Sequence, residues 1–196
     1  MAHTFSIEQP APAGLSAAHR RLLTGLTRRS IEHGLEHGRG LPVCADEFDP
    51  PLRALRASFV TLKKRGELRG CIGALAAVRP LVEDVAHNAF AAAFEDPRFP
   101  GLRPAELADL DTHISVLSAP EPIAFGDELE LLDRIRPGVD GLILTQGRHK
   151  GTFLPSVWEQ LTDPREFLAH LKVKAGLPAD YWSNEIKVER YTTTSW

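Results

Sequence analysis

Apolar residues recur at helical spacing over residues 15–37, and this pattern predicts an amphipathic first helix. Ser16 can cap its first turn, and Gly38 and Gly40 follow its last apolar residue. The positions that form the apolar face are Leu15, Leu22, Leu23, Leu26, Ile31 and Leu35. The first 13 residues contain Pro10 and Pro12, and we expect them to be a loose lead-in.

Alternating apolar and polar residues predict a β-hairpin over residues 57–75. A two-residue loop would place Arg65 at positive φ, whereas a three-residue loop, Lys64-Arg65-Gly66, requires this only of Gly66. We therefore expect the three-residue loop, with Thr61 opposite Arg69. The core-facing side chains are then Val60, Leu62, Leu68 and Ile72. The opposite face carries Phe59, Thr61, Lys63, Glu67, Arg69 and Cys71.

The rest of the chain mixes helices and strands that are joined mainly by hairpins. The pattern predicts helices over 80–94, 104–109, 127–135 and 164–175. It predicts strands over 112–118, 141–145, 151–154 and 186–194. This order favours an α+β fold in which helices flank an antiparallel sheet. We expect residues 1–196 to form a single domain, and its internal lobe boundary cannot be read from the sequence.

Composition narrows the class of protein. The 196 residues carry a net charge of −3, with 43% hydrophobic and 25% charged residues, which is ordinary for a globular protein. An acidic balance gives no general attraction to nucleic acid, so RNA binding is the weakest hypothesis. No apolar run approaches the ~20 residues of a membrane helix, and the start lacks the pattern of a signal peptide. Two cysteines do not make a disulfide framework, so we expect a cytoplasmic protein.

The candidate chemistry centres on Cys71, which lies between Gly70 and Gly73 and two residues from Arg69. Two glycines within a strand suggest that something approaches the backbone closely, and a nearby guanidinium favours a reactive thiolate. Cys71 is therefore a candidate nucleophile, metal ligand or redox thiol. The alternative is a small packed residue, which is the common state of a free cysteine.

A proline-stiffened turn, residues 95–101, follows the helix that begins after this hairpin. Asp96 and Arg98 either end that helix through local hydrogen bonds or form a rigid wall of the site, directed toward Arg69. No phosphate-binding loop, dinucleotide motif, CxxC pair or iron–sulfur ligand set is present, so we expect no metal or cofactor. His33 and His37 fit an H-x-x-E-H pattern, but a glycine follows each, and we do not assign zinc there.

The motif Leu68-Arg69-Gly70-Cys71-Ile72-Gly73, together with Ala92 to Phe99, Ile114 to Leu117, Asp140 to Leu144 and Phe153 to Trp158, resembles the AMME-syndrome candidate family, known in prokaryotes as AmmeMemoRadiSam system protein A. The resemblance implies an α+β fold of two unequal lobes, the larger formed from both chain ends. It also implies a Memo-like protein and a radical S-adenosylmethionine (SAM) enzyme as functional companions. It does not supply a reaction.

Two hypotheses follow for the function. In the first, the protein binds or acts on a small anionic ligand, such as a nucleotide or an RNA-derived molecule. Cys71 is then the candidate catalytic residue, and the candidate ligand-binding residues are Arg69, Gly70, Gly73, Asp96 and Arg98. In the second, the glycine-flanked strand is a non-catalytic docking surface for one of the two companion proteins.

Overall fold

This computed structural model describes residues 14–196, and the predicted lead-in lies outside these described residues. The chain divides into two compact units, with the boundary between Ile114 and Ser115. The last residue, Trp196, belongs to the first and larger unit, in line with the lobe that the resemblance implies to be built from both ends. The α+β class is confirmed, with two four-stranded sheets of order β2-β1-β3-β8 and β4-β7-β5-β6.

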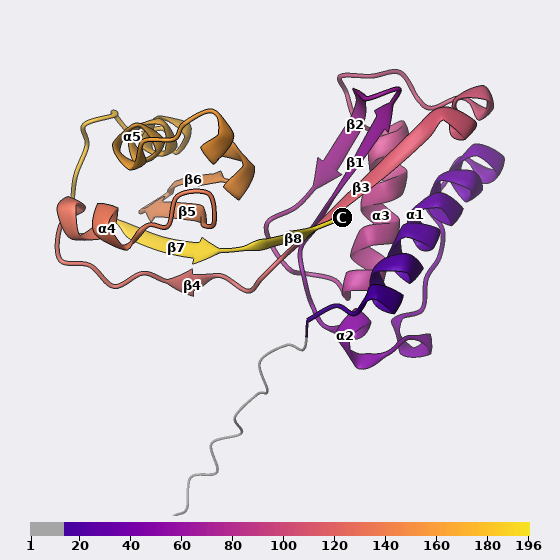
Figure 1. Cartoon of the computed structure of the whole chain (residues 1–196), viewed down its shortest axis with the longest axis horizontal. Helices are drawn as coiled ribbons and strands as arrows, with labels where there is room; N and C mark the ends of the chain where they lie inside the picture. The colour runs from indigo at the N-terminus through magenta and orange to yellow at the C-terminus, as the bar shows by residue number, and fades with distance from the viewer. Residues whose placement is uncertain (1–13) are drawn as a thin grey trace, which may run out of the picture. The chain divides into compact units, whose positions relative to one another are not determined.

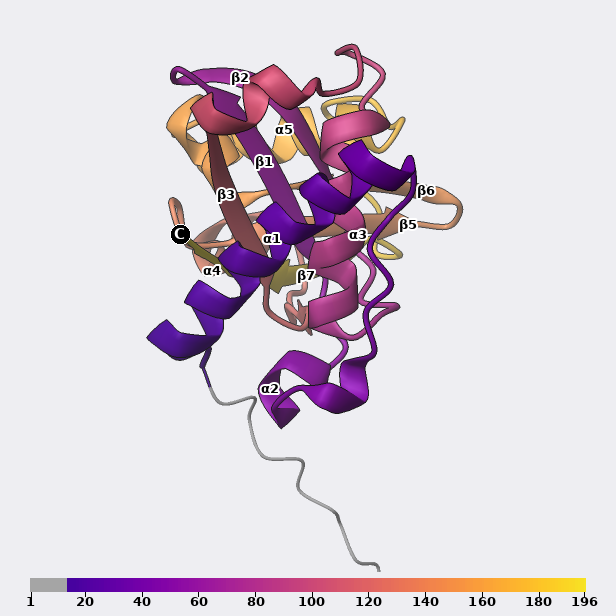
Figure 2. The same ribbon diagram turned by 90° about the vertical axis from the view of Figure 1, so that its right-hand side faces the viewer.

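Two long helices cover one face of a hairpin in the first unit (Figures 1 and 2). Ser16 caps the first of them as predicted, accepting a hydrogen bond from the backbone N–H of His19. The elements of this unit are α1 (Ala17–His37), η1 (Ala45–Glu47), α2 (Pro50–Arg53), β1 (Ser58–Lys64), β2 (Glu67–Gly73), α3 (Leu81–Phe94), η2 (Pro104–Asp109) and the first part of β3 (Leu110–Leu117). Their core includes Leu23, Ile31, Val60, Leu62, Leu81 and Val85, all fully buried.

The second unit packs α5 (Pro164–Lys174) against a sheet, as Figure 1 shows. Asp163 caps this helix, and Pro164 is its first residue, as the sequence predicts. The other elements are β4 (Glu121–Pro122), α4 (Glu128–Arg134), β5 (Gly141–Gln146), β6 (His149–Phe153), η3 (Pro155–Glu159), β7 (Lys187–Tyr191) and β8 (Thr193–Ser195). Trp158 and Phe167 stack within its core with their ring centroids 3.8 Å apart. None of the helices described is long and apolar enough to cross a membrane.

The predicted loop of the first hairpin is wrong. The turn has two residues, Arg65 and Gly66, both at positive φ (53° and 85°). A two-residue turn with both residues at positive φ matches the right-handed twist of the strands, and this match compensates for the steric penalty at Arg65. The register then places Lys64 opposite Glu67 and shifts between Leu62 and Lys63, where β2 carries one extra residue.

This bulge changes which side chains of β2 face the core. Leu68 pairs with Lys63 instead of joining the core, and it is 44% exposed. Beyond the bulge the alternation resumes, so Ile72 pairs with the buried Val60 as a core-facing residue. Cys71 lies on the opposite face from Val60 and Leu62, as expected, but the predicted pairing of Thr61 with Arg69 is wrong, because Thr61 pairs with Cys71. We call this second face, around Phe59, Thr61 and Cys71, the outer face.

Candidate functional site

The thiol of Cys71 is half-buried on the outer face. Its sulfur lies 3.2 Å from Oγ1 of Thr61 on the neighbouring strand, and either atom can be the donor of that hydrogen bond. The ring of Phe59, also half-buried, lies against Gly73 on the same face. Cys71 is therefore neither fully exposed nor sealed in the core.

The two glycines beside Cys71 make room for neighbouring parts of the protein. A Cβ at Gly70 would lie 2.0 Å from the carbonyl oxygen of Ala92 in α3, and one at Gly73 would lie 2.4 Å from the ring of Phe59. The expectation of a close approach is correct in its geometry. The groups that approach are the α3 backbone and an aromatic ring, so neither glycine leaves open space for a ligand on that side.

Asp96 and Arg98 hold the backbone of Cys71. The carboxylate of Asp96, which is 3% exposed, accepts a hydrogen bond from the Cys71 backbone N–H at 2.9 Å. Arg98 donates from Nε and Nη2 to the same carboxylate and from Nη2 to the Cys71 carbonyl at 3.2 Å. Because β2 is an edge strand, these bonds satisfy groups that would otherwise face outward.

Arg98 supplies a cation that is hydrogen-bonded to the backbone of Cys71. Its hydrogen bond to Asp96 raises the pKa of the guanidinium. The same hydrogen bond holds the pKa of Asp96 well below its ordinary value. The Asp96–Arg98 pair is thus charged at neutral pH, and half of the Arg98 side chain (54%) stays exposed.

Arg69 does not play the role that the sequence predicts. At the bulge its guanidinium turns to Glu106 in η2, donating from Nε and Nη2 at 3.1 Å each. Lys64 donates to the same carboxylate at 2.9 Å. The Arg69 side chain is only 11% exposed, and its third nitrogen, Nη1, is buried without a hydrogen-bond partner. The structure thus brings Cys71, Asp96 and Arg98 together and directs Arg69 to a separate ion-pair cluster.

The Arg69–Glu106–Lys64 cluster makes stability depend on pH. Hydrogen bonds from Arg69 first, and then from Lys64, lower the pKa of Glu106 to about 2 from 4.5. A carboxylate with a depressed folded-state pKa stabilises the fold above its unfolded pKa and loses that contribution as the pH falls. We expect the urea midpoint to fall as the pH is lowered from 4.5 toward 2, and the Glu106→Gln variant to show a flatter profile over this range. Parallel profiles for the two proteins would contradict this account.

A buried polar cluster at the base of the hairpin was missed from the sequence. The carboxylate of Asp84 accepts hydrogen bonds from the Ser58 hydroxyl at 2.6 Å and backbone N–H at 2.9 Å, and Asn88 donates to both residues. Burial raises the pKa of Asp84. A helical wheel of the sequence places Asp84 and Asn88 on the polar face of this helix with His87, but of these three residues only His87 is exposed.

Apolar neighbours could have revealed this cluster, because Leu81 and Val85 flank Asp84 on the same helix and are fully buried. The cluster ties α3 to the first residue of β1 and therefore positions the hairpin.

Within residues 14–196, no group of three or more histidine, cysteine or acidic side chains is arranged to hold a metal ion. His33 and His37 stack on each other, with ring centroids 4.2 Å apart.

The chain is an α+β protein of two units, and the strand β2 (Glu67–Gly73) of its first unit carries the candidate site. The sequence model of the AMMECR1 family matches residues 24–196, and the chain belongs to this family. It is 41% identical over 181 residues to a protein of Methanothermobacter thermautotrophicus, with 91% of this chain and 94% of that protein covered. It is 42% identical over 189 residues to a protein of Thermofilum pendens, with 90% and 88% covered.

A solved structure shares the fold. The crystal structure of the uncharacterized protein PH0010 from Pyrococcus horikoshii superposes with a TM-score of 0.76 at 38% sequence identity. The similarity covers 89% of this chain and 88% of that one. The chain thus shares a fold already solved for a related archaeal protein.

Proposed function

We propose that this protein is the A component of an AmmeMemoRadiSam system and that its outer face binds a small anionic ligand beside the thiol of Cys71. Membership of the AMMECR1 family and the Leu68–Gly73 motif support the first part. The observation that carries the second part is the half-exposed Arg98 guanidinium, which is hydrogen-bonded to the backbone carbonyl of the residue whose thiol is half-buried. In this proposal, Arg98 takes the anion-binding role that the sequence assigned to Arg69.

The geometry of Arg98 suits an anion. A guanidinium presents a planar fork of N–H donors that matches carboxylate and phosphate groups. Asp96 and the Cys71 carbonyl engage Nε and Nη2, and no partner is recorded for Nη1 among the described residues. Asp96 offsets part of the positive charge and also fixes the orientation of the fork. The hydroxyl of Thr61 and the ring of Phe59 would supply a hydrogen bond and an apolar wall.

In this proposal the thiol serves as a nucleophile or as a sensor, since it lies half-buried on the outer face beside Thr61. The companions in this proposal are a Memo-like protein and a radical SAM enzyme, and the ligand could be a nucleotide or an RNA-derived anion. Asp96 holds Cys71 through the backbone, so the thiol keeps its position without a ligand. A preorganised group of this kind needs little ordering when a ligand binds.

Alkylation tests the role of the thiol, and the chain offers a matched control in the exposed Cys44. In the Cys44→Ser variant, we expect iodoacetamide at neutral pH to label Cys71 stoichiometrically and faster than a cysteine in an unstructured peptide. Inorganic phosphate or pyrophosphate should slow this reaction by occupying Arg98. The rate is measured by intact mass. In the Cys71→Ser variant, Cys44 should be labelled at the rate of the peptide cysteine, and neither phosphate nor pyrophosphate should change that rate.

The Arg98→Gln variant tests whether the labelling rate of Cys71 depends on the guanidinium or only on the exposure of the thiol. Made in the Cys44→Ser background, it should label more slowly and lose its response to phosphate. A folded Cys44→Ser protein that labels at the peptide rate, with no effect of either anion, would remove both the reactive thiol and the anion site. The family assignment does not depend on this result.

The exposed Leu68 on the edge strand favours a second function, that of a non-catalytic docking module. Large apolar side chains at a sheet edge are common in protein interfaces. Under this alternative, the Leu68→Ser variant would weaken binding to the Memo-like or radical SAM companion, while Cys71→Ser would leave both binding and cellular function intact. Loss of function in Cys71→Ser at unchanged partner affinity would favour the ligand site instead.

A further inference from the structure

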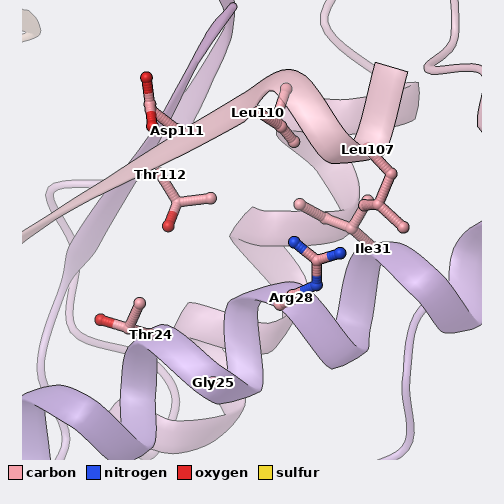
Figure 3. A pocket seen from close by; sticks show the side chains of 8 residues that line it. All are labelled: Thr24, Gly25, Arg28, Ile31, Leu107, Leu110, Asp111 and Thr112. Carbon is pink, nitrogen blue, oxygen red and sulfur yellow. The ribbon is translucent and has the colours of Figure 1, made fainter. Parts of the chain in front are cut away.

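A cavity of about 390 Å³ lies in the first unit between α1, η2 and the start of β3 (Figure 3). It is lined by none of the residues of the Cys71 site. One end is apolar and is formed by Ile31, Leu107 and Leu110. Its volume falls within the range of small-molecule sites, roughly 300–1,000 Å³.

A single cation reaches into this cavity. Figure 3 shows the guanidinium of Arg28 rising from α1 into the space below β3, next to Ile31, with the hydroxyl of Thr112 across that space. Its Nε donates to Glu32 at 2.9 Å, and among residues 14–196 the structure records no acceptor for its two terminal nitrogens. Asp111 also lines the cavity, and its exposed carboxylate is directed away from Arg28 in Figure 3.

The floor of the cavity is a glycine that packing does not require. Gly25 lies inside α1, and a Cβ built there would meet no atom within 4 Å. Glycine inside a helix is less favourable than alanine by about 1 kcal/mol. Gly34 in the same helix has a packing reason, because a Cβ there would lie 2.4 Å from the ring of Phe94. The glycine at position 25 therefore does not stabilise the helix, but the absence of a side chain there keeps the cavity open.

We propose that this cavity binds a small carboxylic acid with an apolar body. The carboxylate would lie on the two terminal nitrogens of Arg28 and accept a hydrogen bond from Thr112. The apolar body would pack over Gly25 toward Ile31, Leu107 and Leu110. The combination of one cation, one hydroxyl and an apolar end selects a ligand with a single anionic group and no second charge.

Thr24 lines the cavity and connects it to Trp196. Its hydroxyl donates to the carbonyl of Arg20 and accepts a hydrogen bond from Nε1 of Trp196 at 3.1 Å. The guanidinium of Arg20 lies over the Trp196 ring, 5.6 Å from its centroid. The last residue is thus fixed beside the cavity, and a bound carboxylate should change the environment of its indole.

Binding is tested on the full chain with phenylpropanoate as the probe and its neutral amide as the matched control. We expect amide NMR spectra to shift saturably at Gly25 and Thr112 with the acid, and the Trp196 indole signal to move with them. The neutral amide should bind roughly tenfold more weakly or worse, because it cannot form the charge-assisted pair. Inorganic phosphate, which has no apolar body, should not compete.

Two variants locate the site. Arg28→Gln should weaken phenylpropanoate binding roughly tenfold or more, whereas Arg21→Gln, an exposed change on the same helix, should not. Gly25→Leu should fill the floor and abolish binding without lowering the unfolding temperature. The proposal is overturned if the acid gives no saturable shifts, if the acid and the amide bind equally, or if both site variants bind like the wild type. None of these readouts depends on Cys71.

Discussion

The Gly70→Ala variant is expected to be less stable than the wild type by about 3 kcal/mol, the upper end of the range for overpacked cores. The added methyl group would lie 2.0 Å from the carbonyl oxygen of Ala92, far inside any contact distance. The obstructing atom belongs to the backbone of a buried helix, so no rotamer change can relieve the clash. Only a shift of α3 away from β2 could accommodate it, and that shift would open the core around Val60 and Leu62.

Urea denaturation provides the measurement, and Gly25→Ala is the matched control. In the control, the new methyl group enters open space inside a helix, so stability should rise by about 1 kcal/mol. Adding Ala92→Gly to Gly70→Ala should not restore stability, because the clash involves the carbonyl and not the Ala92 side chain. A Gly70→Ala protein that unfolds at the wild-type midpoint would show that α3 and β2 are not packed as described.

Replacing Asp96 by alanine should also lower stability by about 3 kcal/mol, because removing this buried carboxylate leaves the hydrogen-bond donors around it without their acceptor. The Cys71 N–H loses its acceptor, and Arg98 loses the carboxylate that orients it. The variant should exchange the Cys71 amide proton faster than the rest of β1 and β2. Urea denaturation and hydrogen exchange measure the two effects.

Asp109→Ala is the control for Asp96→Ala, because Asp109 pairs with Arg65 at the exposed hairpin end. Exposed ion pairs contribute about 0–1 kcal/mol, so this change should have little effect. The pH dependence adds a second check. Since the pKa of Asp96 is held well below 3.8, its contribution is present above that pH and is lost as the pH falls further. Equal stability losses in the two variants would contradict the role assigned to Asp96.

The helices of this protein could be predicted well from the sequence because their signals are local. Ser16 and Asp163 cap α1 and α5 through their own side chains, and Pro80 precedes α3 directly. The strands of the second hairpin were also predicted, but its loop was expected to span 146–150, and β5 and β6 are joined by only two residues, Gly147 and Arg148. Gly147 supplies a positive φ to this turn. Capping and turn chemistry depend on neighbours a few residues away, which a sequence displays.

The candidate site was predicted only in part, because its geometry depends on one bulge. The sequence identified Cys71, Asp96 and Arg98, and these three do lie together. It placed Arg69 beside Cys71 because strict alternation was assumed, and the extra residue in β2 breaks that alternation. The turn at Arg65 was misjudged for a related reason: the strain at one residue was weighed without the twist of the strands it joins.

The polar residues of α3 show a further limit of sequence reasoning. Asp84 and Asn88 look solvated on a helical wheel, but their partner, Ser58, lies 26 and 30 residues away along the chain. A buried polar group is tolerated only when a partner is present, and a single sequence does not reveal partners at that range. Gly70 and Gly73 illustrate the same point, since the groups that crowd them come from α3 and β1.

The Asp96–Arg98 pair also restricts how other chains can join this molecule. Exposed sheet edges invite foreign strands to extend the sheet, which leads to fibrillar or swapped assemblies. At the middle of β2 the donor and the acceptor of Cys71 are already occupied by side chains of the same protein. An incoming strand would have to displace both before it could pair there. Any chain that binds along this edge must therefore recognise protruding side chains, and the strand that carries Cys71 offers no template for self-association at this point.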